Sequence, residues 1–148
     1  MSWIYKHKKV TEAPEGAFGF IYKLTLVKQV GTHKPGAIYI GKKQFTSVRK
    51  TLRTKKDKAA DGNNRKKIKY VSTPMKWEEY WSSSKEILNL IAEHGTDIFK
   101  RDIIEFTYDK YNHSFKEIEQ MILHQVHKVP TLNGTIGKYF ISKLNNKK

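Results

Sequence analysis

Two short segments near the amino terminus have the composition of paired β-strands. Residues 18–30 and 37–40 are rich in aromatic and β-branched side chains, which favour strands. Residues 31–36 between them read Gly-Thr-His-Lys-Pro-Gly, a composition typical of a turn. The pattern therefore predicts a β-hairpin that carries Tyr22 on one strand and Tyr39 on the other.

The next hydrophobic pattern has a helical period. Phe45, Val48 and Leu52 follow the spacing i, i+3, i+7, so residues 42–53 are predicted to form a helix with these side chains on one side. Residues 54–67 include the run Ala-Ala-Asp-Gly-Asn-Asn and have no apolar anchor. We expect a flexible basic loop at about residues 54–69, which could order on a nucleic-acid duplex.

The second half of the chain is more regular. One of the serines at 82–84 is predicted to cap a helix that runs to His94 and stops at Gly95. Residues 98–107 are predicted to form a strand with an apolar centre. Together these signals indicate a helix followed directly by a strand.

A second helix and a short tail complete the pattern. Asn112 or Ser114 is expected to cap a helix that continues through about Val126. Asn133 and the glycine after it favour a turn, and residues 135–144 fit either a strand or a short helix. The element order strand, strand, helix, short helix, strand, helix predicts an α/β (α+β) fold, with a small mixed or antiparallel sheet flanked by helices.

Length and composition fit one compact domain. The chain has 148 residues, of which 38% are hydrophobic, so residues 1–148 are expected to form a single domain with a real core. The chain has no cysteine, which excludes disulfides and thiolate zinc sites. No apolar run approaches the roughly 20 residues that a membrane span requires, so an intracellular protein is expected.

The charge points to a polyanionic partner. The formal net charge is +15, from 29 basic and 14 acidic residues. Residues 42–69 hold twelve of the basic residues and only two acidic ones. Nucleic acid is the favoured partner. A membrane surface fits less well, because the basic residues do not lie opposite an apolar stripe. The remaining alternative is a basic face that is simply solvated and binds no partner. The residues expected to bind nucleic acid are Lys50, Arg53, Lys55, Lys56, Arg65, Lys66, Lys67 and Lys69.

Several short segments along the chain resemble those of a known nuclease family. Gly19-Phe20-Ile21-Tyr22 and Tyr39-Ile40-Gly41 are similar to the two signature strands of the GIY-YIG nuclease superfamily. The segments Trp3-Ile4-Tyr5, Tyr80-Trp81-Ser82-Ser83-Ser84-Lys85 and Phe99-Lys100-Arg101 extend the resemblance to a phage-encoded, homing-endonuclease-like (Seg-like) branch. The resemblance covers nearly the whole chain, and its strength lies in the order of the segments.

The resemblance implies a phosphodiester-cleaving site on the hairpin. Tyr22 and Tyr39 match the two signature tyrosines, which would orient or deprotonate the attacking water and contact the phosphate. A free phenol is a poor base at neutral pH, so Lys42 and Lys43 are expected to lower the pKa of Tyr22. Arg49 follows Gly41 at the spacing of the family's catalytic arginine, and a guanidinium can hold two phosphate oxygens at once.

The metal ligand is harder to assign. Register with the family favours Glu117, whereas helical arithmetic places Glu119 nearer the apolar face, so Glu117 is the first choice and Glu119 the second. One carboxylate suits Mg²⁺, or another divalent cation such as Mn²⁺. Asn133 matches an asparagine that the family places near the cleaved phosphate, although Asn-Gly is also a routine turn. The family's glycine in the serine motif is Ser82 here, and this change is not expected to touch the catalytic residues.

These observations predict a metal-dependent DNA endonuclease that hydrolyses phosphodiester bonds. Double-stranded DNA is the expected substrate, and the cytoplasm of a phage-infected bacterial host is the expected location. The alternative is a catalytically inactive basic module that binds DNA or RNA. Because 148 residues leave little recognition surface beyond the catalytic domain, we expect either a homodimer or low sequence specificity.

Overall fold

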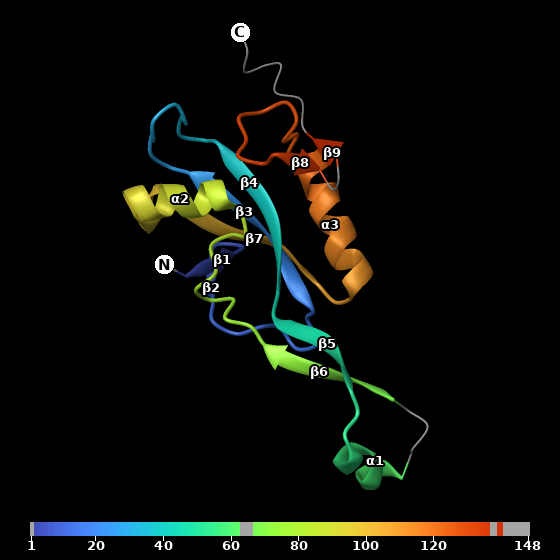
Figure 1. Cartoon of the computed structure of the whole chain (residues 1–148). Coiled ribbons are helices and arrows are strands. Elements are labelled where there is room, and N and C mark those ends of the chain that lie inside the picture. Colours follow the sequence, from blue (N-terminus) through green and yellow to red (C-terminus); the bar gives the residue numbers. More distant parts are fainter. Residues whose placement is uncertain (1, 63–66, 137–138, 141–148) are drawn as a thin grey trace.

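A five-stranded mixed sheet forms the body of the protein (Figure 1). The structure, a computed structural model, describes residues 2–62, 67–136 and 139–140. The sheet order is β2-β1-β7-β3-β4, and its strands are β1 (Trp3–Tyr5), β2 (Lys8–Val10), β3 (Gly19–Leu26), β4 (Ile38–Gln44) and β7 (Phe99–Thr107). β3 is antiparallel to β4 and β7, whereas β1 runs parallel to β7. The predicted α+β class and the hairpin are confirmed.

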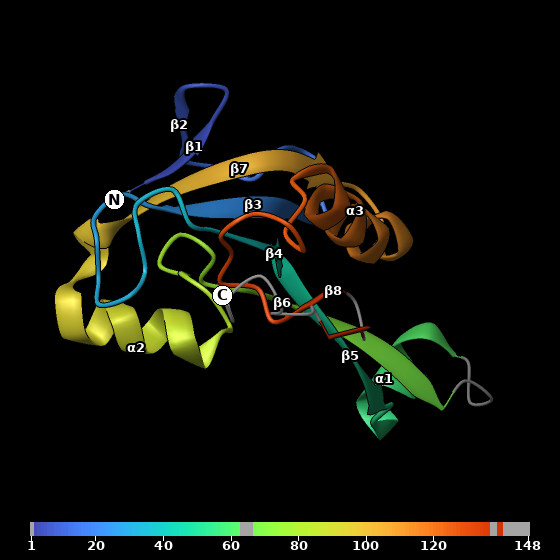
Figure 2. The same ribbon diagram turned by 90° about the horizontal axis from the view of Figure 1, so that it is seen from above.

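Two helices cover opposite faces of this sheet (Figure 2). Alternate residues of β3 point to opposite sides, so Phe20, Tyr22 and Leu24 share the core with Ile87 of α2 (Lys85–His94). On the other face, Ile21 packs with Met121 of α3 (Lys110–Leu123). No described helix is long and apolar enough to cross a membrane.

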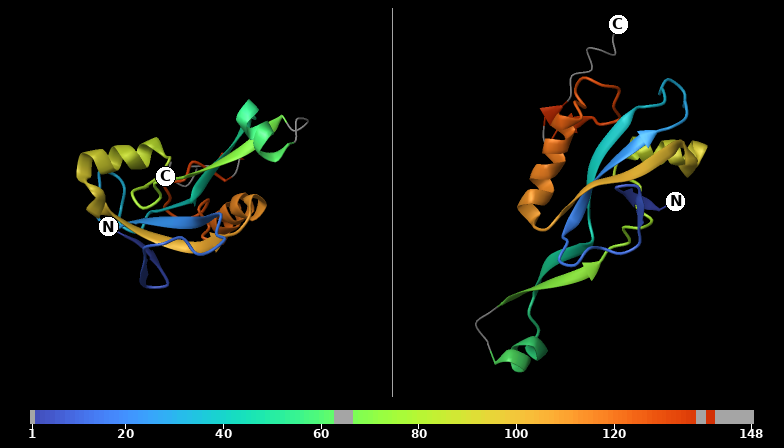
Figure 3. Two further views of the ribbon diagram at one scale, coloured as in Figure 1. Left: turned by 90° about the horizontal axis from the view of Figure 1, so that it is seen from below. Right: turned by 180° about the vertical axis from the view of Figure 1, so that it is seen from behind.

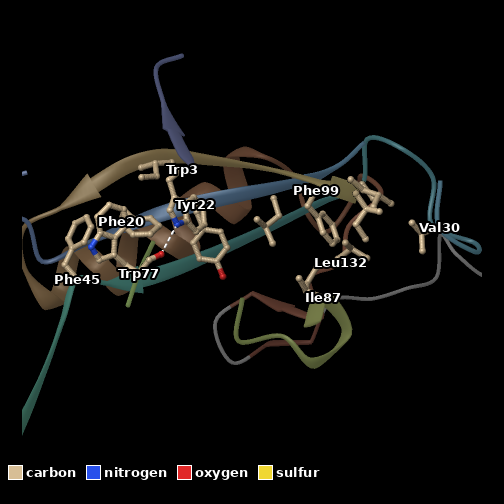
Figure 4. Close-up of a cluster of buried hydrophobic side chains, with 14 residues drawn as sticks. Trp3, Phe20, Tyr22, Val30, Phe45, Trp77, Ile87, Phe99 and Leu132 are labelled. Atoms are coloured by element: carbon tan, nitrogen blue, oxygen red, sulfur yellow. Dashed lines mark hydrogen bonds between the residues drawn. The ribbon is translucent and has the colours of Figure 1, made fainter. Parts of the chain in front are cut away.

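The larger core is mostly aromatic. Figure 4 shows Trp3, Phe20, Phe45 and Trp77 packed side by side, and the ring nitrogen of Trp3 donates a 2.9 Å hydrogen bond to the carbonyl of Trp77. Trp3 belongs to the first strand and Trp77 to the segment before α2, so this contact joins distant parts of the chain. The ring of Tyr22 lies in the same cluster, with its hydroxyl directed away from Trp3.

The helix predicted for residues 42–53 is wrong. β4 continues to Gln44, the chain bends at Phe45, and β5 (Thr46–Leu52) pairs antiparallel with β6 (Ile68–Pro74). The helical spacing failed as a guide because its members are not buried together: Phe45 lies in the core, but Leu52 is 76% exposed. Strand pairing along seven residue pairs therefore overrides the apparent period.

Part of the expected flexible loop is also ordered. α1 (Lys55–Asp61) begins after Thr54, whose hydroxyl accepts from the backbone nitrogen of Asp57, and the Asp57 carboxylate accepts in return from Thr54. This reciprocal capping box and the left-handed Gly62 (φ 68°) define both ends of the helix. We call residues 46–62 and 67–74 the arm; Figures 1 and 3 show β5, β6 and α1 extending away from the main sheet. Arg65 and Lys66 lie outside the described residues.

The remaining elements agree closely with the sequence pattern. Ser84 caps α2, and Gly95 follows its end. The expected strand is β7, preceded by a short 3-10 turn, η1 (Thr96–Ile98). The predicted caps of α3 are wrong: Asp109 is the cap, because its carboxylate accepts from the backbone nitrogen of Asn112 at 2.8 Å. The tail forms two short paired strands, β8 (Thr135–Ile136) and β9 (Tyr139–Phe140), and residues 141–144 lie outside the described residues.

Candidate active site

The two signature tyrosines lie side by side on one face of the hairpin. Tyr22 is opposite Gly41 in the strand register, and Tyr39 is opposite Leu24, so both side chains point to the α2 face. Their ring centroids are 6.2 Å apart. Only 1% of Tyr22 is exposed, whereas Tyr39 is half-buried. The hairpin therefore presents one enclosed and one accessible hydroxyl.

Gly41 makes room for the Tyr22 ring. A Cβ atom added at Gly41 would lie 2.4 Å from both Cζ and Oη of Tyr22, far inside contact distance. The glycine is thus required by the close approach of the tyrosine ring rather than by an unusual backbone conformation. This contact connects the two signature segments physically.

A third wall comes from the segment before α2. The ring of Tyr80 lies 6.0 Å from that of Tyr22, and the Lys43 ammonium lies 4.3 Å from the Tyr80 ring centroid. Ser82 is 4% exposed and lies close enough to both Tyr22 and Tyr39 for hydrogen bonding that lowers their pKa values. The expectation that Ser82 would not touch the catalytic set is therefore wrong. Because its partners are distant in sequence, only the folded chain reveals the contact.

The tyrosines are neutral phenols at neutral pH. Burial raises the pKa of Tyr22 well above its ordinary value, with further increases from Tyr80 and Tyr39. Burial likewise raises the pKa of Tyr39. The expected lowering of the Tyr22 pKa by Lys42 and Lys43 is not found, since Lys42 points to the opposite face of β4 and Lys43 lies over Tyr80. Both hydroxyls are therefore suited to donate hydrogen bonds.

The first turns of α3 bring polar groups to the other face of β4. The Lys42 ammonium donates a 3.0 Å hydrogen bond to the Ser114 hydroxyl. His113 is buried beside it, with Nδ1 2.8 Å from the Thr107 hydroxyl, and burial followed by the charge of Lys42 lowers the His113 pKa to about 4. His113 is thus neutral and structural, while Lys42 keeps a position between α3 and the strand.

The two candidate carboxylates lie in different surroundings. Burial raises the pKa of Glu117, an effect that the charge of Lys42 partly opposes, and the carboxylate is near enough to Tyr39 to raise the pKa of that phenol. Glu119 instead forms a 3.0 Å ion pair with Lys116. Glu117 therefore interacts electrostatically with Lys42 and Tyr39, both on β4, whereas Glu119 has a partner on its own helix.

The sequence that forms this site matches a known protein family. A sequence model of the family described as "Putative endonuclease segE, GIY-YIG domain" matches residues 3–144. The chain belongs to this family. Membership confirms the resemblance seen in the sequence and indicates nuclease activity on DNA. No curated protein and no solved structure gives a match.

A divalent cation fits the Glu117 side of the site. The carboxylate is half-buried, and burial raises its pKa, so its surroundings undercompensate the negative charge that a bound cation would balance. Among the described residues, no group of three or more His, Cys, Asp or Glu side chains gathers. A site with one carboxylate suits Mg²⁺, which retains several of its water ligands.

The arginine expected at the site lies on the arm. Arg49 is in β5, paired through the backbone with Val71, and the described part of the structure does not include its side chain or that of Lys50. β4 ends at Gln44 and β5 then leads away from the main sheet (Figure 1), so the backbone of Arg49 lies on the arm and not on the hairpin that carries the tyrosines. Of the other predicted DNA-binding residues, Arg53, Lys55, Lys56, Lys67 and Lys69 are all on the arm.

Asn133 is a buried link to the edge strand, not an exposed turn residue. Its amide oxygen accepts from the backbone nitrogen of Ile40 at 2.8 Å, and its amide nitrogen donates to the Ile40 carbonyl at 2.9 Å. Ile40 stands between Tyr39 and Gly41, so this pair of hydrogen bonds fixes β4 at the signature residues. The hydroxyl of Thr131 supports the same contact by accepting from the Asn133 backbone nitrogen.

Arg101 was missed by sequence reasoning. It is buried between two indole rings, with its guanidinium carbon 4.6 Å from the Trp3 ring and 4.2 Å from the Trp81 ring. It donates to the carbonyls of Glu78 and Tyr80 at 3.2 and 2.8 Å, and burial lowers its pKa to about 10. Arg101 thereby holds the segment that carries Tyr80 and Ser82. No local sequence signal indicated this stacked cation, because Trp3 and Trp81 are distant from Arg101 in the sequence.

An open groove of about 340 Å³ runs around the end of β4. Lys43 and Tyr80 line it from one face of the strand, and Lys42, His113 and Ser114 line it from the other. The groove therefore connects the tyrosine side with the α3 side, and its charged lining is cationic at neutral pH.

Proposed function

We propose that this protein is a divalent-metal-dependent endonuclease that hydrolyses phosphodiester bonds in double-stranded DNA. The observation that supports it is the adjacency of Tyr22 and Tyr39 on the hairpin, with Glu117 near enough to Tyr39 to raise its pKa, in a chain of an endonuclease family. The cationic groove beside this cluster offers a path for the DNA backbone.

Each residue has a role that follows from its surroundings. Glu117 would hold Mg²⁺ or Mn²⁺, which when bound stabilises negative charge on the phosphate oxygens. Tyr22, enclosed and protonated, would donate a hydrogen bond that orients the attacking water, and Tyr39 would donate to a phosphate oxygen. Lys42 and Lys43 would hold the backbone in the groove, and Asn133 would fix the strand that carries Tyr39.

Arg49 is proposed as the phosphate-holding arginine. Because Arg49 lies on β5, kinetic measurements are needed to tell whether it acts in the chemical step or in DNA binding. Loss at the chemical step in Arg49→Ala, measured in single-turnover reactions at saturating protein, would support contact with the cleaved phosphate. A change confined to the DNA concentration dependence would instead assign Arg49 to binding along the arm.

The metal ligand is tested by a matched pair of variants. In plasmid nicking with Mg²⁺, Glu117→Gln is expected to lower the rate by at least about 100-fold, since a metal contributes several kcal/mol of charge stabilisation. Glu119→Gln, two residues away on the same helix, is expected to stay within about threefold of wild type because its partner is Lys116. Thermal unfolding of both variants controls for misfolding.

The reverse pattern would move the ligand to Glu119. Wild-type protein that binds DNA but cleaves nothing with Mg²⁺ or Mn²⁺ would favour the alternative of an inactive module, and tighter binding to structured RNA would favour an RNA partner.

We further propose a homing-type role in the cytoplasm of a phage-infected bacterium, with a homodimer supplying extra recognition surface. Sedimentation with and without duplex DNA tests the homodimer. A protein that stays monomeric on a DNA site that it cleaves would contradict it.

A further inference from the structure

We propose that the arm is a recognition element that enters the major groove of B-form DNA, away from the cleaved phosphate. This inference rests on the proposed function only in taking duplex DNA as the bound polymer. The arm is a two-stranded ribbon whose strands pair over seven positions, from Thr46–Pro74 to Leu52–Ile68. A two-stranded β-ribbon is one of the two elements that the B-DNA major groove can admit.

The charge of the chain is concentrated on this element. Residues 46–62 and 67–74 contain eight basic and two acidic residues, a net charge of +6 out of +15 for the whole chain. Lys55, Lys56 and Lys67 are exposed at its outer end. A surface that projects from the body with this density of cations is complementary to phosphate backbones on either side of a groove.

Several contacts join the described residues at the outer end of the arm. The Asp57 carboxylate caps α1 and also accepts a 2.7 Å ion-pair contact from Lys69 of β6. Hydrogen bonds to Lys69 and Thr54 lower the Asp57 pKa to about 2, so the connection persists at neutral pH. Arg53 adds a 3.0 Å contact to the Asp57 carbonyl. An element ordered before binding loses less conformational entropy on the DNA than a flexible loop would.

An apolar pair lies among these cations. Leu52 and Ile68 are opposite each other in the register, and they are 76% and 44% exposed. Both are therefore large hydrophobic side chains left in solvent on the arm. Apolar side chains in the major groove contact thymine methyl groups, so this pair offers sequence preference that lysines alone do not.

The base of the arm is fixed to the wall of the candidate active site. The Phe45 ring lies 5.1 Å from Trp77 and 5.3 Å from Phe20, and the Met75 nitrogen donates to the Phe45 carbonyl at 2.9 Å. Phe20 is two residues before Tyr22 on β3. Seven strand residues span about 23 Å, or on the order of 7 base pairs, so contacts of the arm would lie more than half a helical turn from the cleaved bond.

Salt-dependent binding tests the charge contribution independently of cleavage. Affinity for a 40-base-pair duplex would be measured in EDTA over a range of salt for wild type, for Lys55→Gln/Lys56→Gln/Lys67→Gln, and for Lys8→Gln/Lys9→Gln/Lys34→Gln. The second triple removes the same charge from exposed positions outside the arm. The arm triple is expected to reduce the slope of log K against log salt by about 2 to 3, since each lost phosphate contact changes it by about 0.9, while the control slope changes by less than about 1.

Chemical protection tests the groove. Wild-type protein in EDTA is expected to protect guanine N7, which faces the major groove, and the arm triple is expected to lose that protection. Equal slopes for the two triples, unprotected N7, or equal affinity for an A-form RNA duplex with its narrow major groove would each overturn the proposal. Because no step uses Glu117 or a metal, these results stand apart from the nicking assay: cleavage can fail while arm binding holds, and the reverse.

Discussion

At the scale of single residues, the signature tripeptides describe one contact rather than two separate motifs. Gly41 is opposite Tyr22 and leaves the space that the phenol ring occupies. Ser82, from a segment forty residues later, approaches the hydroxyls of both Tyr22 and Tyr39. The hydroxyls of Tyr22 and Tyr39 are therefore positioned by close packing across strands, in which small side chains matter as much as polar ones.

Gly41→Ala tests this packing. The added methyl group would force the Tyr22 ring to move, so cleavage is expected to fall by about 10- to 100-fold, with a loss of about 1–3 kcal/mol in unfolding free energy. Gly134→Ala is the control, because a Cβ there meets nothing within 4 Å. Urea denaturation and plasmid nicking give the two readouts. Full activity in Gly41→Ala would contradict a fixed Tyr22 ring.

The sequence indicated the tyrosines, Glu117 and Asn133 because the family spacing can be followed along the chain. It gave no indication that burial raises the pKa of Tyr22, that Ser82 approaches both phenols, or that Arg101 is stacked between two indoles. Each of these depends on residues that are distant in sequence, and a local pattern carries no information about them. Asn133 was found for its family position, yet its double hydrogen bond to Ile40 required the folded sheet edge.

At the scale of elements, the capped helix α2 and the strand β7 followed the local pattern, whereas residues 42–53 did not. A helical spacing of three apolar residues is weak evidence where the segment leaves the body of the protein and its last apolar side chain, that of Leu52, is exposed. Pairing with β6 decided the outcome, and β6 lies beyond the intervening helix α1. The arm is thus an element whose identity depends on a partner more than a dozen residues away.

The attachment of α3 to the sheet predicts a pH dependence. His113 has a pKa of about 4 in the folded protein and near 6.5 when unfolded, because it is buried and faces Lys42. Between these values the unfolded chain binds the proton more readily, so stability is full above about pH 6.5 and falls as the pH drops toward 4, by on the order of 2–3 kcal/mol.

Urea unfolding at pH 7 and pH 5 checks this expectation. His113→Gln should have a lower free energy of unfolding than wild type at pH 7. Its free energy of unfolding should also fall less than that of wild type between pH 7 and pH 5, because the titrating imidazole is gone. His127→Gln, at an exposed position, should keep the wild-type difference. An unchanged pH dependence in His113→Gln would assign the effect to other groups.

At the scale of the whole molecule, the first strand closes the aromatic core. Trp3 contacts Tyr22 with ring centroids 5.2 Å apart, donates to the Trp77 carbonyl and stacks on Arg101. Trp3→Ala is expected to reduce unfolding free energy by about 3–5 kcal/mol and to reduce cleavage as well. Trp3→Phe keeps a ring but loses the hydrogen bond, so a smaller loss of about 1–2 kcal/mol is expected. Denaturation curves that rank the two variants equally would contradict a role for the hydrogen bond.

The pairing of β1 with β7 also sets an order of events during synthesis. Ile4 pairs with Asp102, so β1 leaves the ribosome nearly a hundred residues before its partner strand β7. The tyrosine hairpin can form locally, whereas the groups around it come from the middle and end of the chain. Such long-range closure slows folding, and a nascent or truncated chain would carry the tyrosines without Glu117. Cutting activity should therefore emerge only once translation has passed α3, as a cell-free synthesis time course could follow.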